Sequence, residues 1–356
     1  MTVKIMSYRS KLLWVRNMAI RQAVVMVGGK GTRLLPLTEN NPKPILSVAD
    51  RPCIWYLLRS LARAGIEEVI LACGYKSKQM EVLGDGSDLG LRIIYSYEDE
   101  PRGTAGAMKL VEERLDEQFV AANGDVFADI DVAEEISLHE RTGAAITMAL
   151  TPVENPCEFG IVLTDDEDRI VEFKEKPRPE EAFSNLINAG VYVIDRSILA
   201  HVPEGQFFDF SRDLVPIVMD EGRRIQGYKL KGLWMDVGRP HDLLEANLSV
   251  AEREFGSRSF PAEDACVRGA FYMGEGSKAA NSEIVSSVIL AGSKITDSSL
   301  NRVLVMQDSV VEGAHIVNSI VGKGCVIKQG CKIVNTVIAD NTVLEPGTEM
   351  DEGRKV

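Results

Sequence analysis

A glycine-rich loop and two basic residues after it are the features best suited to phosphate chemistry. Gly28–Arg33 (GGKGTR) directly follows the apolar run Ala23–Val27, and ten residues after Arg33, Lys43 stands between two prolines. Glycines let backbone N–H groups approach phosphate oxygens closely, and a guanidinium can bind phosphate through two hydrogen bonds. The alternative is a glycine turn with two solvated cations. The spacing matches neither the dinucleotide-binding fingerprint nor the P-loop.

Two aspartates are candidate metal ligands. Asp125 follows the apolar run Phe119–Ala122, and Asp236 lies in the segment Trp234–Gly238. Magnesium prefers hard oxygen ligands, often one or two carboxylates together with substrate phosphates. An aspartate after a strand can equally be a helix cap or a turn residue, so both interpretations of Asp125 stay open at this point.

Two further polar segments follow predicted strands. Glu175-Lys176-Pro177 is either a ligand-binding pair or a solvated charge pair at a strand end. Gly103–Ala107 opens a predicted helix, where Thr104 could simply cap the first turn.

Alternating apolar and amphipathic stretches between Gln22 and about Thr151 must position these residues. Glycine-terminated apolar runs are typical of buried parallel strands, and the stretches between them favour helices. The pattern predicts a doubly wound α/β sheet with ligand loops at the carboxyl ends of its strands. The expected strands are Ala23–Val27, Val69–Cys73, Leu91–Tyr97 and Phe119–Ala122. One helix is expected to begin at Pro52, and two more are expected near Lys76–Leu83 and Thr104–Arg114.

The segment from Pro152 to Val237 has a mixed pattern that predicts a partly antiparallel insertion supplying the second substrate site. Its expected strands are Gly160–Thr164, Ile170–Lys174 and Ile187–Ile194, followed by a helix near Phe210–Glu221. A helix over His241–Arg253 should then leave the domain, with Phe255–Pro261 as a linker.

The C-terminal segment carries internal repeats. Asparagines at 301, 318 and 335 each open a similar stretch, 17 residues apart, and Ser286 opens a fourth stretch 15 residues before Asn301. Within a repeat, Val321, Ile327 and Ile333 recur at every sixth residue. This period predicts a triangular coil of short strands, a hexapeptide-repeat parallel β-helix. An antiparallel sandwich is the alternative. The predicted domains are an N-terminal extension (1–21), a catalytic domain (22–254) and the β-helix (262–356).

Composition restricts the class of protein. The formal charge is −13, which argues against nucleic-acid binding through bulk electrostatics. Six cysteines without a C-x-x-C pair indicate small buried residues in a reducing cytoplasm. Four scattered histidines argue against a zinc site or a histidine-based triad. No apolar stretch approaches the roughly 20 residues of a membrane span.

The combination GGKGTR, LPLT and PKP after a strand resembles the sugar-1-phosphate nucleotidyltransferase (nucleotide-sugar pyrophosphorylase) family. The resemblance extends from Gln22 through the repeats and implies the family's fold, a Rossmann-like mixed sheet followed by a left-handed β-helix. It implies Mg²⁺ binding by Asp125 and Asp236, and catalysis by Arg33, Lys43, Asp125, Lys176 and Asp236. The implied nucleotide-binding residues are Gly28, Gly29, Gly31, Thr32, Arg33, Gly103, Thr104 and Asn123, and the implied sugar-phosphate residues are Gly160, Glu175, Lys176 and Asn188.

The reaction implied is attack by a sugar 1-phosphate on the α-phosphorus of a nucleoside triphosphate, with release of pyrophosphate. The segments at 103–106, 188–190 and 234–238 most resemble mannose-1-phosphate guanylyltransferases, which implies GTP and mannose 1-phosphate as substrates. Glucose-1-phosphate thymidylyl- or uridylyltransferases, using dTTP or UTP, are the alternative. A non-catalytic regulatory subunit that binds nucleotide sugars is a third possibility, and a homodimer or homotetramer is expected.

Overall fold

The computed structural model describes residues 19–29, 31–74, 77–255, 265–352 and 354–355. The predicted N-terminal extension and linker therefore lie largely outside the described residues. Contacts divide the chain into two compact units: one comprises Met1–Gly29 and Ile54–Trp234, and the other comprises Lys30–Cys53 and Met235–Val356. The segment after the glycine loop is thus grouped with the C-terminal part of the chain. The domain boundaries derived from the sequence stay predictions.

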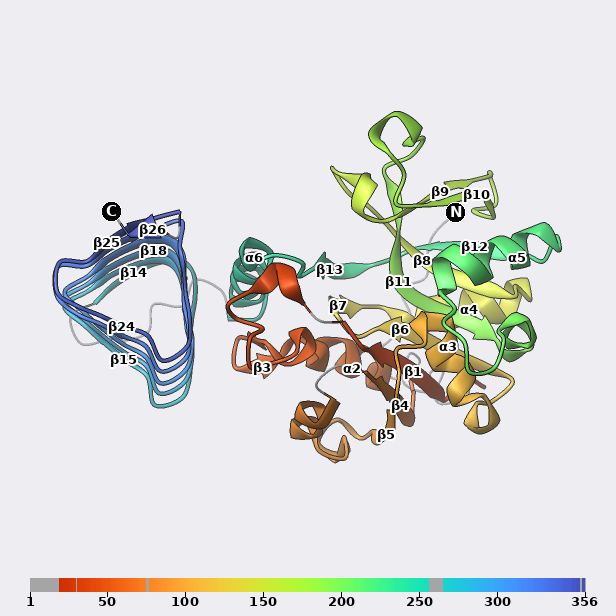
Figure 1. Ribbon diagram of the computed structural model, residues 1–356, viewed down its shortest axis with the longest axis horizontal. Coiled ribbons are helices and arrows are strands. Elements are labelled where there is room, and N and C mark those ends of the chain that lie inside the picture. Colours follow the sequence, from red (N-terminus) through yellow and green to blue (C-terminus); the bar gives the residue numbers. More distant parts are fainter. Residues whose placement is uncertain (1–18, 30, 75–76, 256–264, 353, 356) are drawn as a thin grey trace, which may run out of the picture. The chain divides into compact units, whose positions relative to one another are not determined.

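A nine-stranded mixed sheet forms the first unit (Figure 1), with strand order β10-β9-β11-β6-β1-β4-β5 and with β8 joining β12 to β11. β1 (Gln22–Val27) is buried at all six positions and pairs in parallel with both β4 and β6. Val24 and Met26 belong to a core cluster with residues of α3 (Gly103–Leu110), while Val25 and Val27, on the other face, are buried as well. Both faces of β1 are therefore covered, as expected of a doubly wound sheet.

The predicted strands of the sheet are confirmed. The strands not yet given bounds are β4 (Glu68–Cys73), β5 (Arg92–Tyr97), β6 (Gln118–Asn123), β9 (Gly160–Thr164), β10 (Ile170–Glu175) and β11 (Leu186–Asp195). β11 runs antiparallel to β6, β8 and β9, which confirms a partly antiparallel insertion. Among the described residues before the coil, six strands were not predicted: β2 (Ser47–Val48), β3 (Arg51–Pro52), β7 (Val126–Ile130), β8 (Ile146–Pro152), β12 (Ile225–Lys229) and β13 (Gly232–Asp236).

The helices agree in position and differ in detail. α2 (Cys53–Arg63) follows Pro52 directly, and its apolar stripe is buried. The prediction of a single helix over 104–114 is wrong. The α-helix α3 spans Gly103–Leu110, and a separate 3₁₀ turn over Glu112–Arg114 follows Val111. The region predicted near 76–83 is a 3₁₀ helix over Ser77–Leu83. α4 (Val132–Thr142) was missed, and it packs against β8, β11 and β12.

A π-helical turn adjoins each of the last two α-helices, α5 and α6. A π-helical turn (Phe210–Leu214) leads into α5 (Val215–Asp220) in the first unit. In the second unit, α6 (Pro240–Val250) continues into a π-helical turn over Ala251–Phe255. No described helix is both long and apolar enough to cross a membrane.

The C-terminal coil is built from stacked parallel strands (Figure 1), consistent with a left-handed hexapeptide β-helix. Val321, Ile327 and Ile333 are fully buried, as the six-residue period requires. Its strands are β14 (Cys266–Met273), β15 (Lys278–Ala280), β16 (Glu283–Ile289), β17 (Lys294–Thr296), β18 (Ser299–Val305), β19 (Val310–Glu312), β20 (His315–Val321), β21 (Val326–Ile327), β22 (Lys332–Val334), β23 (Val337–Ile338), β24 (Val343–Leu344), β25 (Glu349–Asp351) and β26 (Arg354–Lys355).

The repeat alignment is wrong by one residue at its first asparagine. Asn301 pairs with Val317, and Val303 pairs with Ser319, so Arg302 is the counterpart of Asn318. Ser286, Arg302, Asn318 and Asn335 all have positive φ, which marks the same corner of successive coils. Asparagine tolerates this left-handed conformation better than most residues, and the extra residue in the last repeat produced the apparent 17-residue period.

The cysteine prediction holds for four of the six residues. Cys53, Cys73, Cys325 and Cys331 are buried free thiols, and burial raises the pKa of Cys73 to about 12. Cys157 is half-buried and Cys266 is exposed, so the expectation of burial is wrong for these two.

Candidate functional site

Lys43 pairs with the carboxylate of Asp236, which lies 193 residues further along the chain. The distance from Lys43 Nζ to Asp236 Oδ1 is 2.9 Å, and the lysine side chain is only 6% exposed. Pro42 holds the extended backbone just before the 3₁₀ helix Lys43–Ile45, and Pro44 occupies its first turn. A buried ammonium group needs an opposite charge, so the fold brings these two predicted catalytic residues together.

Arg33 approaches the other oxygen of the same carboxylate. Its Nη2 lies 3.8 Å from Asp236 Oδ2, and its side chain is 54% exposed. A Cβ at Gly238 would lie 3.0 Å from Asp236 Oδ2 and 3.2 Å from Arg33 Nη2, so a glycine leaves room for this pair. Gly238 thus has a structural role at the site that the sequence did not reveal. The second unit thereby joins one exposed cation, one buried cation and one carboxylate.

The glycine loop is shaped by close contacts at two of its glycines. Gly31 has a φ of 62°, and Thr38 Oγ1 donates a 2.8 Å hydrogen bond to its carbonyl oxygen. A Cβ on Gly31 would lie 3.1 Å from the Thr38 methyl group. In the first unit, Gly28 backs onto Gly74, where a Cβ would approach Gly28 Cα to 3.1 Å. Gly29 and Gly31 flank position 30, which is outside the described residues, and Thr32 begins a 3₁₀ helix over Thr32–Leu34.

Asn123, Gly124 and Asp125 form a tightly packed turn at the carboxyl end of β6. The Gly124 amide donates to the Met26 carbonyl at 2.8 Å, and a Cβ there would lie 2.4 Å from Val27 Cγ1. Asn123 packs against Gly190, whose φ of 75° and contact with the Asn123 amide leave no room for a side chain. This packing fixes the backbone that carries Asp125, a half-buried residue.

Glu175 and Gly160 lie opposite each other on β10 and β9. A Cβ on Gly160 would lie 2.7 Å from Glu175 Oε2, so the carboxylate fills the space that the glycine leaves. Burial raises the pKa of Glu175, and the positive charge of the neighbouring Lys176 acts in the opposite direction. Lys176 has a φ of 47°, and its amide donates to the Phe159 carbonyl at 2.9 Å. Such left-handed backbone at a non-glycine residue is strained and is concentrated at ligand sites.

Asn188 anchors the same part of the first unit through its side chain. Its Nδ2 donates to the Tyr192 hydroxyl at 2.7 Å and to Ser211 Oγ at 3.3 Å, while its Oδ1 accepts from the Gly190 amide at 2.9 Å. The pairing of β11 with β8 is irregular between Asn188 and Tyr192, which sets this asparagine apart from the regular ladder. Gly160, Glu175 and Asn188 therefore lie on three adjacent strands.

Sequence reasoning missed Arg212 as part of this region. Burial raises the pKa of Glu175, and the positive charge of Arg212, like that of Lys176, opposes this rise. Asp209 Oδ1 accepts hydrogen bonds from the amides of Ser211 and Arg212, which starts the helical turn that carries the arginine. The Asp-Phe-Ser-Arg segment is a helix-capping pattern that could have signalled the helix start, but it carries no signal for the position of Arg212 near Glu175.

Thr104 is a structural link to the same turn. Its hydroxyl donates to Asp209 Oδ2 at 3.2 Å and accepts from the Phe210 amide at 2.8 Å. The amides of Ala105 and Gly106 both donate to the Phe208 carbonyl. The nucleotide-binding role of Gly103 and Thr104 stays a prediction, and the structure adds that this loop supports the segment 208–212.

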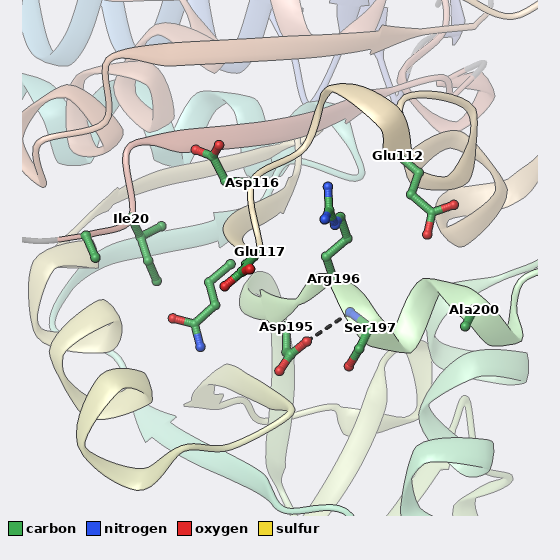
Figure 2. Close-up of a pocket in the computed structure, with 10 residues that line it drawn as sticks. Ile20, Glu112, Asp116, Glu117, Asp195, Arg196, Ser197 and Ala200 are labelled. Atoms are coloured by element: carbon green, nitrogen blue, oxygen red, sulfur yellow. Dashed lines mark hydrogen bonds between the residues drawn. The ribbon is translucent and has the colours of Figure 1, made fainter.

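A cavity of about 570 Å³ (Figure 2) lies at the amino end of β6, whereas Asn123 lies at the carboxyl end of that strand and Asp125 follows it. It is lined by Gln118 at the start of β6 and by Asp195 at the end of the antiparallel β11, and none of the predicted site residues lines it. Figure 2 shows the Asp195 carboxylate bonded to the Ser197 amide, at 2.9 Å. Among the described residues, no group of three or more His, Cys, Asp or Glu side chains could hold a metal ion.

A family model described as nucleotidyl transferase matches residues 22–253. The chain belongs to this family. A second model, described as a GlmU-like C-terminal hexapeptide, matches residues 271–355. The family resemblance inferred from the GGKGTR segment and the repeats is confirmed by these two matches.

Several relatives are similar over the N-terminal part. Mannose-1-phosphate guanylyltransferase of Mycobacterium tuberculosis is 41% identical over 231 residues, which cover 64% of each chain. The catalytic subunit beta of mannose-1-phosphate guanylyltransferase from Drosophila pseudoobscura pseudoobscura is 38% identical over 63% of this chain and 60% of its own length. This chain thus spans less than two thirds of the length of these two relatives.

Another relative extends into the coil. UTP–glucose-1-phosphate uridylyltransferase of Synechocystis is 30% identical over 326 residues, covering 86% of this chain and 80% of its own length. Among solved structures, a Bacillus anthracis protein assigned as a glucose-1-phosphate thymidylyltransferase aligns with a TM-score of 0.59 and 23% identity. It covers 67% of this chain and 96% of that chain, and at this identity it supports the fold alone.

Proposed function

We propose that this chain is a sugar-1-phosphate nucleotidyltransferase that makes a nucleotide sugar and pyrophosphate. The observation that carries the proposal is the convergence of Lys43 and Arg33 on Asp236. It sets two cations suited to polyphosphate beside a carboxylate suited to a metal ion. The membership in the nucleotidyl transferase family and the names of the relatives support the same reaction class.

The proposed reaction is a single in-line displacement. An anionic oxygen of the sugar 1-phosphate forms a bond to the α-phosphorus, and the bond from that phosphorus to the bridging oxygen of pyrophosphate breaks. The nucleophile is already ionised, so no side chain needs to remove a proton. Catalysis then depends on positioning and on neutralising charge.

The proposed roles follow from the chemistry of each side chain. Arg33 and Lys43 stabilise negative charge on the departing pyrophosphate, and the glycine-loop amides of residues 28–31 assist them. Lys176 holds the sugar phosphate, and Glu175 accepts hydrogen bonds from sugar hydroxyls. Arg212 adds a second positive charge near Glu175.

Asp125 and Asp236 are the proposed magnesium ligands. Two carboxylates are hard oxygen donors of the kind that Mg²⁺ prefers, so the residues fit the ion. When bound, Mg²⁺ supplies positive charge that offsets the charge of the reacting phosphates. Removal of divalent ions with EDTA should abolish pyrophosphate release, and added Mg²⁺ should restore it; full activity in EDTA would contradict this part of the proposal.

We propose GTP and mannose 1-phosphate as the substrates. The names of the two guanylyltransferase relatives favour this pair. UTP and glucose 1-phosphate form a second candidate pair, because the uridylyltransferase relative aligns over most of this chain, including part of the coil. A cytoplasmic location and assembly as a homodimer or homotetramer stay predictions.

The deciding experiment is a grid of nucleoside triphosphates against hexose 1-phosphates, with pyrophosphate release as the readout. Release with GTP and mannose 1-phosphate above every other pair is the expected result. Asp125→Asn should lower kcat by about 100-fold or more. Asp116→Asn, a change in the cavity at the amino end of β6, is the matched control and should leave kcat unchanged. No release from folded protein would favour a nucleotide-sugar-binding subunit, which calorimetry would then test.

A further inference from the structure

A two-residue turn in the second unit has an unusual backbone. β2 (Ser47–Val48) and β3 (Arg51–Pro52) form a short hairpin, and the two residues that join them, Ala49 and Asp50, both have positive φ, 46° and 61°. Hairpin turns of this form normally use Asn-Gly, because a Cβ disfavours left-handed backbone. Such strain persists only where the surroundings hold it.

The Asp50 carboxylate is held by three successive coils of the β-helix. It accepts hydrogen bonds from the Tyr272 hydroxyl at 3.1 Å, from the Ala291 amide at 3.1 Å and from Gln307 Nε2 at 3.2 Å. A Cβ on Gly274 would lie 2.0 Å from Asp50 Oδ2, so only glycine fits beside the carboxylate.

Helix α6 holds the other side of the hairpin. The fully buried Asn247 accepts from the Ala49 amide at 2.9 Å and donates to the Ser47 carbonyl at 3.1 Å. Gln307 also donates to Ser47 Oγ at 2.8 Å, and Arg302 of β18 pairs with Glu245 of α6. The hairpin, the helix and the coil are thus tied to one another by polar side chains.

Both members of the Lys43–Asp236 pair lie close in sequence to this arrangement. Lys43 lies four residues before Ser47, and its carbonyl accepts from the Leu46 amide at 3.1 Å, while the Leu46 carbonyl accepts from the Cys53 amide at 2.9 Å. Asp236 lies four residues before α6, which begins at Pro240. The chain therefore runs from Lys43 into the hairpin, and from Asp236 into α6, the helix that is hydrogen-bonded to the hairpin through Asn247.

We propose that Asp50 is a positioning residue through which the β-helix holds the Lys43–Asp236 pair in its reactive arrangement. This inference rests on the proposed function, because it gives Lys43 and Asp236 a role in nucleotidyl transfer. It assigns the coil a part in catalysis through contacts within the second unit.

Asp50→Gly in the full chain is the decisive variant. Glycine adopts a positive φ without strain and lacks the carboxylate side chain. The hairpin can therefore form while its hydrogen bonds to the coil are lost. We expect kcat for pyrophosphate release to fall about tenfold, with KM for the sugar phosphate within twofold of the parent value. Gln307→Ala should reproduce part of the loss. Asp340→Asn is the control, because Asp340 also accepts from a coil amide, that of Lys323, and makes none of the Asp50 contacts.

Hydrogen exchange provides a readout that does not depend on activity. The Leu46 and Cys53 amides should exchange faster in Asp50→Gly than in the parent or in Asp340→Asn. Unchanged exchange would overturn the proposal, and so would faster exchange with parental kcat. An inactive parent chain would instead refute the proposed function, and the link between coil and hairpin would then be judged by exchange alone.

Discussion

The Lys43–Asp236 pair and the Glu175–Gly160 pair each hold a carboxylate in place, but by different interactions. The first joins residues 193 positions apart and neutralises a buried ammonium group with a carboxylate. The second places a half-buried carboxylate against a glycine on the neighbouring strand, so local strand register decides the contact. The comparison teaches that the Lys43–Asp236 contact depends on charge pairing over a long range, while the Glu175–Gly160 contact depends on space left by a missing side chain.

Asp236→Asn should have the largest effect. It removes a proposed metal ligand and also the charge that compensates Lys43 and Arg33. We expect kcat to fall by about 1,000-fold, measured by pyrophosphate release. Circular dichroism should confirm that the variant is folded. A kcat within tenfold of the parent would break the comparison, because charge pairing would then contribute little to turnover.

Arg33→Ala and Lys43→Ala should separate the exposed cation from the buried one. Both should lower kcat by about 100-fold, since each is proposed to stabilise the pyrophosphate charge. Only Lys43→Ala should reduce the free energy of unfolding, by about 1–3 kcal/mol, because it removes the ammonium group that pairs with the partly buried carboxylate of Asp236. Urea titration measures this difference, and equal stability of the two variants would contradict it.

Glu175→Gln should raise KM for the sugar phosphate about tenfold, because a neutral amide is a weaker acceptor for sugar hydroxyls than a carboxylate. Kinetics at varied sugar phosphate measure it. In the parent, KM should also rise as the pH falls through the raised pKa of Glu175. An unchanged KM in the variant would remove Glu175 from the sugar site.

The same substitution has an opposite effect on stability. Because the pKa of Glu175 is raised in the fold, its protonated form contributes stability that is present below the ordinary value of 4.5 and is lost as the pH rises through the raised pKa. Glu175→Gln should therefore be more stable than the parent at neutral pH, with the gap closing in acid. Unfolding by urea at several pH values measures the gap, and a pH-independent gap would be the contrary result.

Gly160→Ala should have the smallest effect. The added methyl group would lie 2.7 Å from Glu175 Oε2 and 2.7 Å from Phe173 Cζ, so the carboxylate would rotate away and the ring would shift slightly against the core on which it packs. We expect a loss of about 1 kcal/mol in unfolding free energy and a KM for the sugar phosphate raised less than in Glu175→Gln. A larger rise in KM than in that variant would mean that Gly160 contacts the sugar directly.

Several elements could be predicted because their signal is local. The apolar run of β1 and the stripe of α2 reflect burial on both faces and on one face, respectively, and both can be recognised along the chain. β7 and β12 escaped prediction because they are five-residue strands without a clear alternating pattern. The break between α3 and the turn at 112–114 was also missed, since no proline or glycine marks it.

The sequence by itself determined the glycine-rich loop after the first strand, the positions of the main strands of the α/β sheet and the six-residue period of the coil. These follow from residue type and spacing, which act over a few neighbours. Only the tertiary structure decided that Lys43 meets Asp236, that Arg212 lies near Glu175, and that Asp50 bonds to three coils. Such partners are far apart in the chain, and their pairing depends on long-range packing and on the charges that packing buries.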